Sequence, residues 1–161
     1  MKDEDGFSDF VRRRGDALTR TARLLIPDRG DAEHAVQTAL LRLTRHWPVD
    51  SPEAYVRRAL VNLATDRGRR RHLVPEPAEP RDDRFRSLPD HADAHASQLF
   101  LEELLRLVPE RQRSAIVLRV VEGLSESETA QTMGCSAGTV KSNLSRGLAR
   151  LRDLLPEGAS R

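Results

Sequence analysis

The sequence predicts an all-α protein made of two small helical domains joined by a proline-rich linker. Apolar residues recur at helical spacing through most of the chain, and no stretch alternates as a half-buried strand would. Four prolines interrupt this pattern between residues 73 and 97. Only 4% of the 161 residues are aromatic, so each core must consist mostly of Leu, Val and Ala.

The composition excludes several classes of protein. Charged residues make up 32% of the chain, but the formal net charge is only +2, so a nucleic-acid surface must be local. No apolar run approaches the length of a membrane span, and residues 1–6 are too polar for a signal peptide. The only cysteine, Cys135, cannot form an internal disulfide. We therefore expect a cytoplasmic protein that binds no membrane.

Two helices are predicted before residue 48. The first should run from about Ser8 to Ile26, and a turn over 27–30 should lead to a second helix capped by Asp31. The second helix has a regular apolar stripe made of Ala32, Ala35, Val36, Ala39, Leu40, Leu43 and Trp47. Its other face is polar apart from Leu41, which is either a stray surface leucine or part of a partner surface.

A third helix is predicted to begin at Ser51-Pro52-Glu53, which combines a cap, a first-turn proline and an early acid. Val56, Ala59, Leu60 and Leu63 should face a core. The opposite side carries Arg58, Asn62, Thr65, Asp66 and Arg69. The basic run over 67–72 is either a solvated helix end or a phosphate-binding cluster, and we favour phosphate.

Residues 73–97 are predicted to form a flexible acidic linker. His91 and His95 are four residues apart there, so an alternative hypothesis is a metal site of an enzyme or adaptor. No third ligand is evident, and we expect no metal. The second domain should begin at Gln98, with a short helix and then another from Pro109 to Gly123. In that helix Ile116, Val117 and Val120 should point inward.

Residues 124–152 are predicted to form two helices joined by a tight turn. Ser125 and Glu128 form a capping box, Gly134 should end the first helix, and Ser136 should cap the second. The second helix has an apolar stripe, and its other face carries Thr139, Lys141, Ser142, Ser145, Arg146 and Arg150. This face suits the major groove of DNA. The alternative is an ordinary helical hairpin with a solvated charged face.

The order of these motifs resembles bacterial sigma factors of the extracytoplasmic-function (ECF) type, the smallest branch of the sigma-70 family. The resemblance to sigma region 2 covers 31–37, Trp47 and 55–71, and the resemblance to region 4 covers 107–119, 122–130 and 138–142. The length of the chain and its motifs are most similar to those of actinobacterial members. The resemblance implies a region 2 three-helix bundle over 6–72, the linker over 73–97, and a region 4 helix-turn-helix over 98–156.

The resemblance also implies roles for the exposed faces. The second helix would dock on the clamp helices of the RNA polymerase beta-prime subunit through Asp31, Glu33, Gln37, Leu41 and Arg42. The loop after it would capture a base flipped from the promoter −10 element, involving Trp47 and Asp50. The third helix would approach the upstream edge of that element through Arg58, Asn62, Asp66 and Arg69. The recognition helix would read the −35 element through Thr139, Lys141, Ser142, Ser145 and Arg146.

The family would bind core RNA polymerase, including its beta flap, and promoter DNA both as duplex and as single strand, and an anti-sigma factor is a further partner. No catalytic residue set, cofactor or small-molecule substrate is expected, because no histidine is spaced with a nucleophile. The main alternative is a helix-turn-helix regulator that binds duplex operators as a dimer without polymerase. That alternative leaves the region 2 resemblance unexplained.

Overall fold

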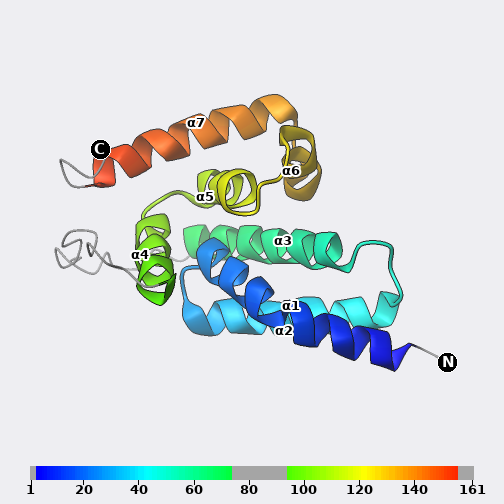
Figure 1. Cartoon of the computed structure of the whole chain (residues 1–161). Helices are drawn as coiled ribbons and strands as arrows, with labels where there is room; N and C mark the ends of the chain where they lie inside the picture. The colour runs from blue at the N-terminus through cyan, green and yellow to red at the C-terminus, as the bar shows by residue number, and fades with distance from the viewer. Residues whose placement is uncertain (1–2, 74–93, 156–161) are drawn as a thin grey trace.

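The structure is a computed structural model that describes residues 3–73 and 94–155, and within them it is entirely helical apart from short connections (Figure 1). The helices are α1 (Glu4–Leu25), α2 (Arg29–His46), α3 (Pro52–Leu73), α4 (Ala94–Arg106), α5 (Glu110–Ile116), α6 (Glu126–Met133) and α7 (Ala137–Leu154). A π-helical turn, η1 (Val117–Val121), continues α5. The predicted all-α class is confirmed.

The first module, residues 3–73, is a bundle of α1, α2 and α3. The bounds of its helices differ from the predicted ones because other residues provide the caps. The Asp3 side chain accepts from the Gly6 amide at 2.9 Å, so α1 begins four residues before Ser8. Asp28 caps α2 by accepting from the Asp31 amide at 2.8 Å, so the cap predicted at Asp31 is wrong. The predicted turn is present at residues 27 and 28, whereas residues 29 and 30 already belong to α2.

The second module, residues 94–155, contains α4 to α7. Its first helix begins at Ala94, within the range predicted as linker, whereas the prolines of that linker and His91 lie outside the described residues. Arg150 on α7 donates to the Leu107 carbonyl at 2.8 Å and so ties α7 to the connection between α4 and α5.

The inward position predicted for Val120 is wrong, since its side chain is 60% exposed. The cause is the π-helical turn, in which the Glu122 amide donates to the Val117 carbonyl, five residues back, at 2.9 Å. The wider turn breaks the 3.6-residue period, so that Val117 and Leu118 are buried while Val120 and Val121 are exposed. Gly123 then ends the element with φ of 68°.

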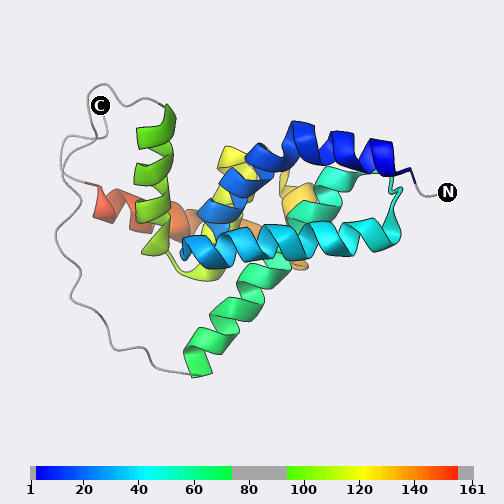
Figure 2. The ribbon, with the colours of Figure 1, turned by 90° about the horizontal axis from the view of Figure 1, so that it is seen from below.

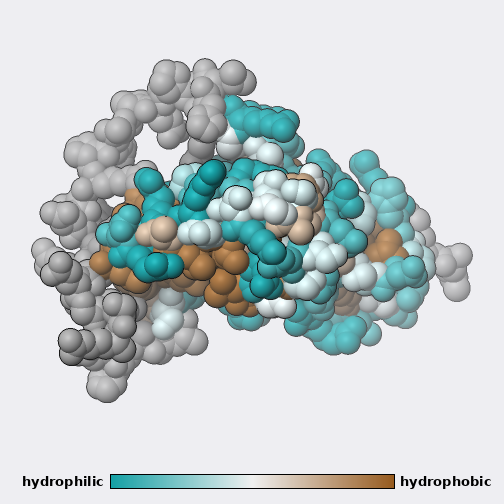
Figure 3. Space-filling model, turned by 90° about the horizontal axis from the view of Figure 1, so that it is seen from above, coloured by the Kyte–Doolittle hydropathy of each residue, from teal (hydrophilic) through white to brown (hydrophobic). Residues whose placement is uncertain are grey.

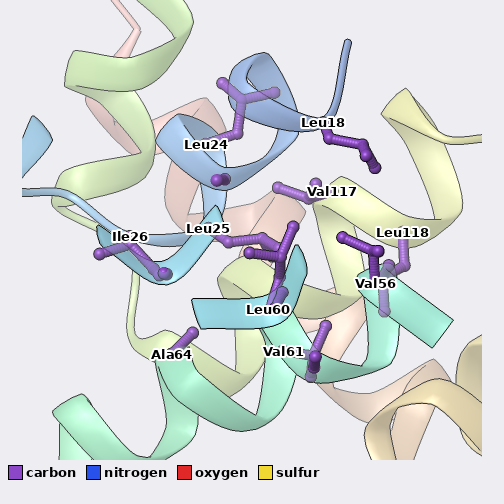
Figure 4. Packing of buried hydrophobic residues seen from close by; sticks show 14 of the residues in the cluster. Leu18, Leu24, Leu25, Ile26, Val56, Leu60, Val61, Ala64, Val117 and Leu118 are labelled. Atoms are coloured by element: carbon purple, nitrogen blue, oxygen red, sulfur yellow. The ribbon is translucent and has the colours of Figure 1, made fainter. Parts of the chain in front are cut away.

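The two modules share one hydrophobic core, because α3 lies between α1 and α2 on one side and α5 and α6 on the other (Figures 1 and 2). Figure 4 shows side chains of α1, α3 and the α5–η1 segment meeting in this core. Val61, which was not among the predicted core residues, is fully buried, as is Leu118 of the second module. The modules therefore pack against each other in this structure.

Arg113 of α5 is buried at the junction of the modules. Its guanidinium donates to the carbonyls of Leu105 at 2.8 Å and Val108 at 2.9 Å in its own module, and to Leu25 of the first module at 3.0 Å. Leu25 is the last residue of α1, and Leu105 lies in the last turn of α4. The arginine thus donates to carbonyls at the ends of α1 and α4 and to one in the connection after α4.

No helix within residues 3–73 and 94–155 combines the length and the apolar character needed to cross a membrane.

A glycine allows α7 to approach α5 closely. Gly147 is buried, and a Cβ atom there would lie 2.7 Å from Ile116 Cδ1 and 3.2 Å from Gln112 Cβ. We predict that Gly147→Ala lowers the free energy of unfolding by about 1–2 kcal/mol, because the clash outweighs the better helix propensity of alanine. Urea denaturation would measure the change.

The matched control is Gly138→Ala on the same helix. The nearest atom to its added Cβ is Ser136 Oγ at 3.8 Å, an ordinary contact. We expect this variant to be neutral or slightly stabilised. Equal unfolding midpoints for the two variants would contradict the close approach of α7 to α5.

Candidate nucleic-acid interface

The helix-turn-helix predicted at 124–152 is confirmed in its local detail. Glu128 N donates to Ser125 Oγ at 3.0 Å and Ser125 N donates to Glu128 Oε1 at 3.3 Å, which is the reciprocal capping box of α6. Gly134 ends α6 in the left-handed conformation, with φ of 66°. Ser136 caps α7 by accepting from the Thr139 amide at 3.1 Å. These contacts fix the angle between the two helices of the motif.

The outer face of α7 presents all the predicted recognition residues to solvent, namely Thr139, Lys141, Ser142, Ser145 and Arg146. Figure 3 views the molecule from the side of α7 and shows hydrophilic and neutral residues there, with an apolar patch toward the C-terminal end of that helix. Ser145 and Arg146 make no hydrogen bond or ion pair with the described part of the chain. Their polar groups are therefore available to a ligand.

One of the cations on this face, Lys141, already has a carboxylate partner within the chain. Lys141 Nζ lies 3.7 Å from Glu126 Oε2 of α6, and both side chains are largely exposed. Such a pair contributes little to stability because water and salt screen it. A phosphate could displace the carboxylate at small cost, so the pair does not block anion binding.

A second polar stripe runs along α3. Arg58, Asn62, Asp66 and Arg69 are exposed and follow one another at helical spacing. Thr65 lies to one side of this stripe, where its hydroxyl donates to Glu110 of the second module at 3.0 Å. The stripe is thus open to solvent although α3 is the central helix of the molecule.

The loop between α2 and α3 is anchored by its tryptophan. The Trp47 ring is half-buried and lies 5.5 Å from the ring of Phe7, edge to face, and 6.1 Å from that of Phe10. A hollow of about 310 Å³ lies beside it, lined by Asp3, Glu4, Phe7, Ser8, Thr44 and Trp47. Asp50 is exposed at the other end of the loop. Trp47 therefore holds the loop against α1, while Asp50 faces solvent.

The exposed face of α2 carries most of the residues predicted to dock on a partner. Glu33, Gln37, Leu41 and Arg42 are exposed, and Leu41 has 66% of its surface accessible. Asp31 is half-buried and forms an ion pair with Arg67 of α3. Glu33 pairs with Arg23 at 3.1 Å. Leu41 is thus a large apolar side chain surrounded by polar groups, which is typical of a protein-binding surface.

Three features at or near the contact between the two modules were not predicted from the sequence. Glu122 and Arg113 make contacts between the modules, and Val120 with Val121 forms an exposed apolar pair. The apolar residues Val61 and Ala64 are a signal that could have revealed the packing of the modules. They give α3 a second buried face, and a helix that is apolar on two sides needs two neighbours.

Within the described ranges, no group of three or more His, Cys, Asp and Glu side chains is placed to hold a metal ion. His95 is exposed on α4, and its predicted partner His91 lies outside the described residues. Cys135, in the turn of the helix-turn-helix, is a half-buried free thiol.

Comparison with known proteins identifies both modules. The family model for sigma-70 region 2 matches residues 10–73, and the model for sigma-70 region 4 matches residues 101–151. The RNA polymerase sigma-E factor of Streptomyces avermitilis is 43% identical over an alignment that covers 92% of this chain and 84% of that protein. The ECF RNA polymerase sigma factor SigM of Mycobacterium tuberculosis is 33% identical, with 95% and 79% covered.

Two solved structures share the fold. The sigma factor RpoE of Bartonella quintana, in complex with the anti-sigma factor NepR, superposes with a TM-score of 0.67 and 26% identity, covering 97% of this chain and 99% of that one. CnrH, in complex with the cytosolic domain of CnrY, gives a TM-score of 0.64 at 23% identity, with 94% and 88% covered.

Proposed function

The chain belongs to the sigma-70 family and is an RNA polymerase sigma factor of the ECF type. From this membership we propose which exposed face binds polymerase and which faces bind promoter DNA during the initiation of transcription. The observation that carries the proposal is that two modules, matching regions 2 and 4, each present an exposed polar stripe on a helix, α3 in one and α7 in the other. A third face, on α2, carries the exposed Leu41.

The α2 face is the proposed docking site for core polymerase. Its residues would contact the clamp helices of the beta-prime subunit, with Leu41 as the apolar centre and Glu33, Gln37 and Arg42 around it. Asp31 would contact polymerase only at the edge of this docking face, since its carboxylate already pairs with Arg67. The beta flap would be held by the second module.

The α3 stripe and the loop before it are the proposed site for the −10 element. Arg58 and Arg69 would bind phosphates, and Asn62 and Asp66 would contact bases at the upstream edge. The loop containing Asp50 would hold a base extruded from the stack, an event that costs a few kcal/mol. Only bases that fit would offset that cost, so melting and sequence reading would be one event. Trp47 would support the loop through its packing on Phe7 and Phe10.

The α7 face is the proposed reader of the −35 element as duplex DNA. Thr139, Ser142 and Ser145 are small hydrogen-bonding side chains near the groove-facing side, and Lys141 and Arg146 are the flanking cations. Because Arg146 has no partner in the described part of the chain, binding to DNA would break no internal contact of that side chain.

We expect binding chemistry only, with no cofactor, small-molecule substrate or catalytic residue, and action in the cytoplasm, where promoters and polymerase are found. An anti-sigma factor is a proposed partner, because the similar structure of RpoE is that of a sigma factor in complex with the anti-sigma factor NepR. A dimeric helix-turn-helix regulator that works without polymerase is not favoured, since it would not need a region 2 module.

The proposal is tested by a pull-down of core RNA polymerase from a Streptomyces with the purified chain, followed by run-off transcription. We expect stable association and initiation at defined start sites. Absence of association, or association without initiation on any template from a genomic library, would refute the proposed function.

Leu41 provides a test of the docking face. We predict that Leu41→Ala weakens binding to core polymerase about tenfold, because a leucine that becomes buried in a complex contributes on the order of 1–2 kcal/mol more than alanine. Leu99→Ala on α4 is the control, as that leucine is also partly exposed but lies outside the docking face. Equal affinities for both variants, measured by fluorescence anisotropy, would contradict the assignment.

Arg146 tests the recognition helix. Arg146→Ala should reduce binding to the upstream element by about 1–3 kcal/mol while leaving the affinity for core polymerase unchanged. Arg152→Ala, which removes an exposed arginine nearer the end of the same helix, should have a much smaller effect. Footprinting of the holoenzyme on a promoter recovered by run-off transcription gives the measurement, and an unaltered footprint with Arg146→Ala would count against the role.

Asn62 tests the link between α3 and DNA melting. Asn62→Ala should slow open-complex formation on duplex promoter DNA but have little effect on a template that is already melted around the −10 element. The pre-melted template is the internal control, because both reactions use the same holoenzyme. An equal loss on the two templates would argue that Asn62 acts in polymerase binding or folding instead.

A further inference from the structure

A hollow of about 360 Å³, here called the arginine hollow, lies where α4 packs on α1. In Figures 1 and 2, α4 stands beside the C-terminal part of α1 and the start of α2. Three arginines line the hollow, Arg20 and Arg23 from α1 and Arg29 from the first turn of α2. None of them belongs to the faces that are proposed to bind polymerase or promoter DNA. The proposed function therefore leaves this cluster of cations unexplained.

Two of the three arginines have unused hydrogen-bond donors in solvent. Arg20 is exposed, and its guanidinium makes no hydrogen bond or ion pair with the described part of the chain. Arg29 is also exposed, and its Nε lies 3.8 Å from Glu102 Oε2, which is too long for a hydrogen bond. Each guanidinium carries five N–H groups, so these two side chains can bind a ligand without losing a strong internal contact.

Arg23 has a buried donor without a partner. Its Nη2 donates to Glu33 Oε1 at 3.1 Å, and this contact orients the guanidinium. Its Nε is shielded from solvent and has no hydrogen-bond partner among the described residues. A buried N–H of this kind is costly, because it has lost its water without gaining an acceptor. An oxygen atom of a ligand bound in the arginine hollow would supply that acceptor.

The chemistry of these donors favours a phosphate group. Arg20 and Arg23 are three residues apart on α1, so they are neighbours on one face of the helix. Guanidinium groups bind phosphate through paired N–H donors, with a geometry that a lysine ammonium cannot match. Two adjacent arginines can therefore share the oxygen atoms of one phosphate group, while Arg29 lines the hollow from α2.

Nearby carboxylates and the size of the hollow limit the ligand further. Asp16 also lines the hollow, and Glu33 and Glu102 lie beside Arg23 and Arg29, so three carboxylates offset the three guanidiniums. A long polyanion such as nucleic acid is not favoured where the local charge is so balanced. The volume falls within the range of small-molecule sites. A small molecule with a single phosphate group fits these limits.

Two polar side chains of the hollow offer acceptors for the rest of such a ligand. The Thr19 hydroxyl donates to the Gly15 carbonyl at 2.9 Å, and Gln98 Nε2 donates to Glu102 Oε1 at 2.9 Å. Both side chains line the hollow, and these contacts leave their oxygen atoms as acceptors. The site thus combines donors for a phosphate with acceptors for hydroxyl or amino groups.

We propose that the arginine hollow binds a small phosphorylated molecule, either a sugar phosphate or a nucleotide, with its phosphate group on Arg20 and Arg23. This site goes beyond the proposed function. Its occupancy is measured on the purified chain without polymerase, so the result is independent of whether the chain initiates transcription.

Isothermal titration calorimetry of the full-length chain tests the binding. The probes are inorganic phosphate, ribose 5-phosphate and AMP, with ribose and adenosine as unphosphorylated controls, in about 150 mM NaCl to screen general attraction between charges. We expect saturable one-to-one binding of ribose 5-phosphate and AMP, weaker binding of inorganic phosphate, and none of the controls. Tighter binding of AMP than of ribose 5-phosphate would identify the site as one for nucleotides, and the reverse order as one for sugar phosphates.

Glutamine variants test the assignment to the arginine hollow. Arg20→Gln should weaken binding of the tighter probe about tenfold, because one charge-assisted contact is lost, and the fold should be kept since the side chain has no internal contact. Arg12→Gln on the same helix and Arg70→Gln at the basic end of α3 are the matched controls, as both arginines are exposed and lie outside the hollow. Both should bind like the wild-type chain.

Nuclear magnetic resonance reports on the buried donor itself. The Nε–H signal of Arg23, assigned by through-bond correlation to its side chain, should shift as the phosphorylated probe is added, with the dissociation constant that calorimetry gives. Unphosphorylated probes should leave it in place.

Three outcomes would overturn the proposal. One is that neither ribose 5-phosphate nor AMP binds, or that ribose and adenosine bind equally well. Another is an equal loss of affinity in Arg20→Gln and in either control variant, which would show general attraction of phosphate to surface arginines. The third is an Arg23 Nε–H signal that stays unchanged while the probe saturates the chain.

Discussion

The structure depends on the buried guanidinium of Arg113. A charged group in the core is costly unless hydrogen bonds replace its water, and three carbonyls do so here. These carbonyls lie at or just beyond the ends of α1 and α4, where the helix dipole is negative, so a cation is favoured there. One side chain thus satisfies helix ends in both modules and holds α5 between them. The position of α7 follows, because Gly147 lets α7 lie directly on α5.

Much of the local structure could be predicted because its causes lie within a few residues. The capping box of Ser125 and Glu128, the left-handed Gly134 and the cap at Ser136 each involve contacts three or four residues apart, and all are present. Where two capping residues competed, the prediction failed. Asp28 and Asp31 are equally good caps by type, and only the structure shows that Asp28 begins α2.

The exposed faces were predictable for a related reason, since a polar stripe opposite an apolar one must face solvent or a ligand. The positions of two residues, Val120 and Trp47, were not predicted correctly by this reasoning. Val120 was misplaced because a π-helical turn shifts the register after Val117, and a single wider turn has no signature in a periodic pattern. Trp47 was assigned both to the buried stripe and to the loop, and its packing on Phe7 and Phe10 needed the position of α1.

The contact between the modules combines buried apolar residues with polar groups. Its apolar part includes Val61 of the first module and Leu118 of the second, which belong to one buried cluster, while its rim contains charged and hydroxyl groups such as Glu122 and Thr21. Exposing the apolar residues Val61 and Leu118 to water would cost on the order of a few kcal/mol. The same α3 residues that make this packing stable leave Arg58, Asn62 and Asp66 in solvent on the other side of the helix. One helix therefore joins the modules and still has an exposed polar face, the one that is proposed to bind DNA.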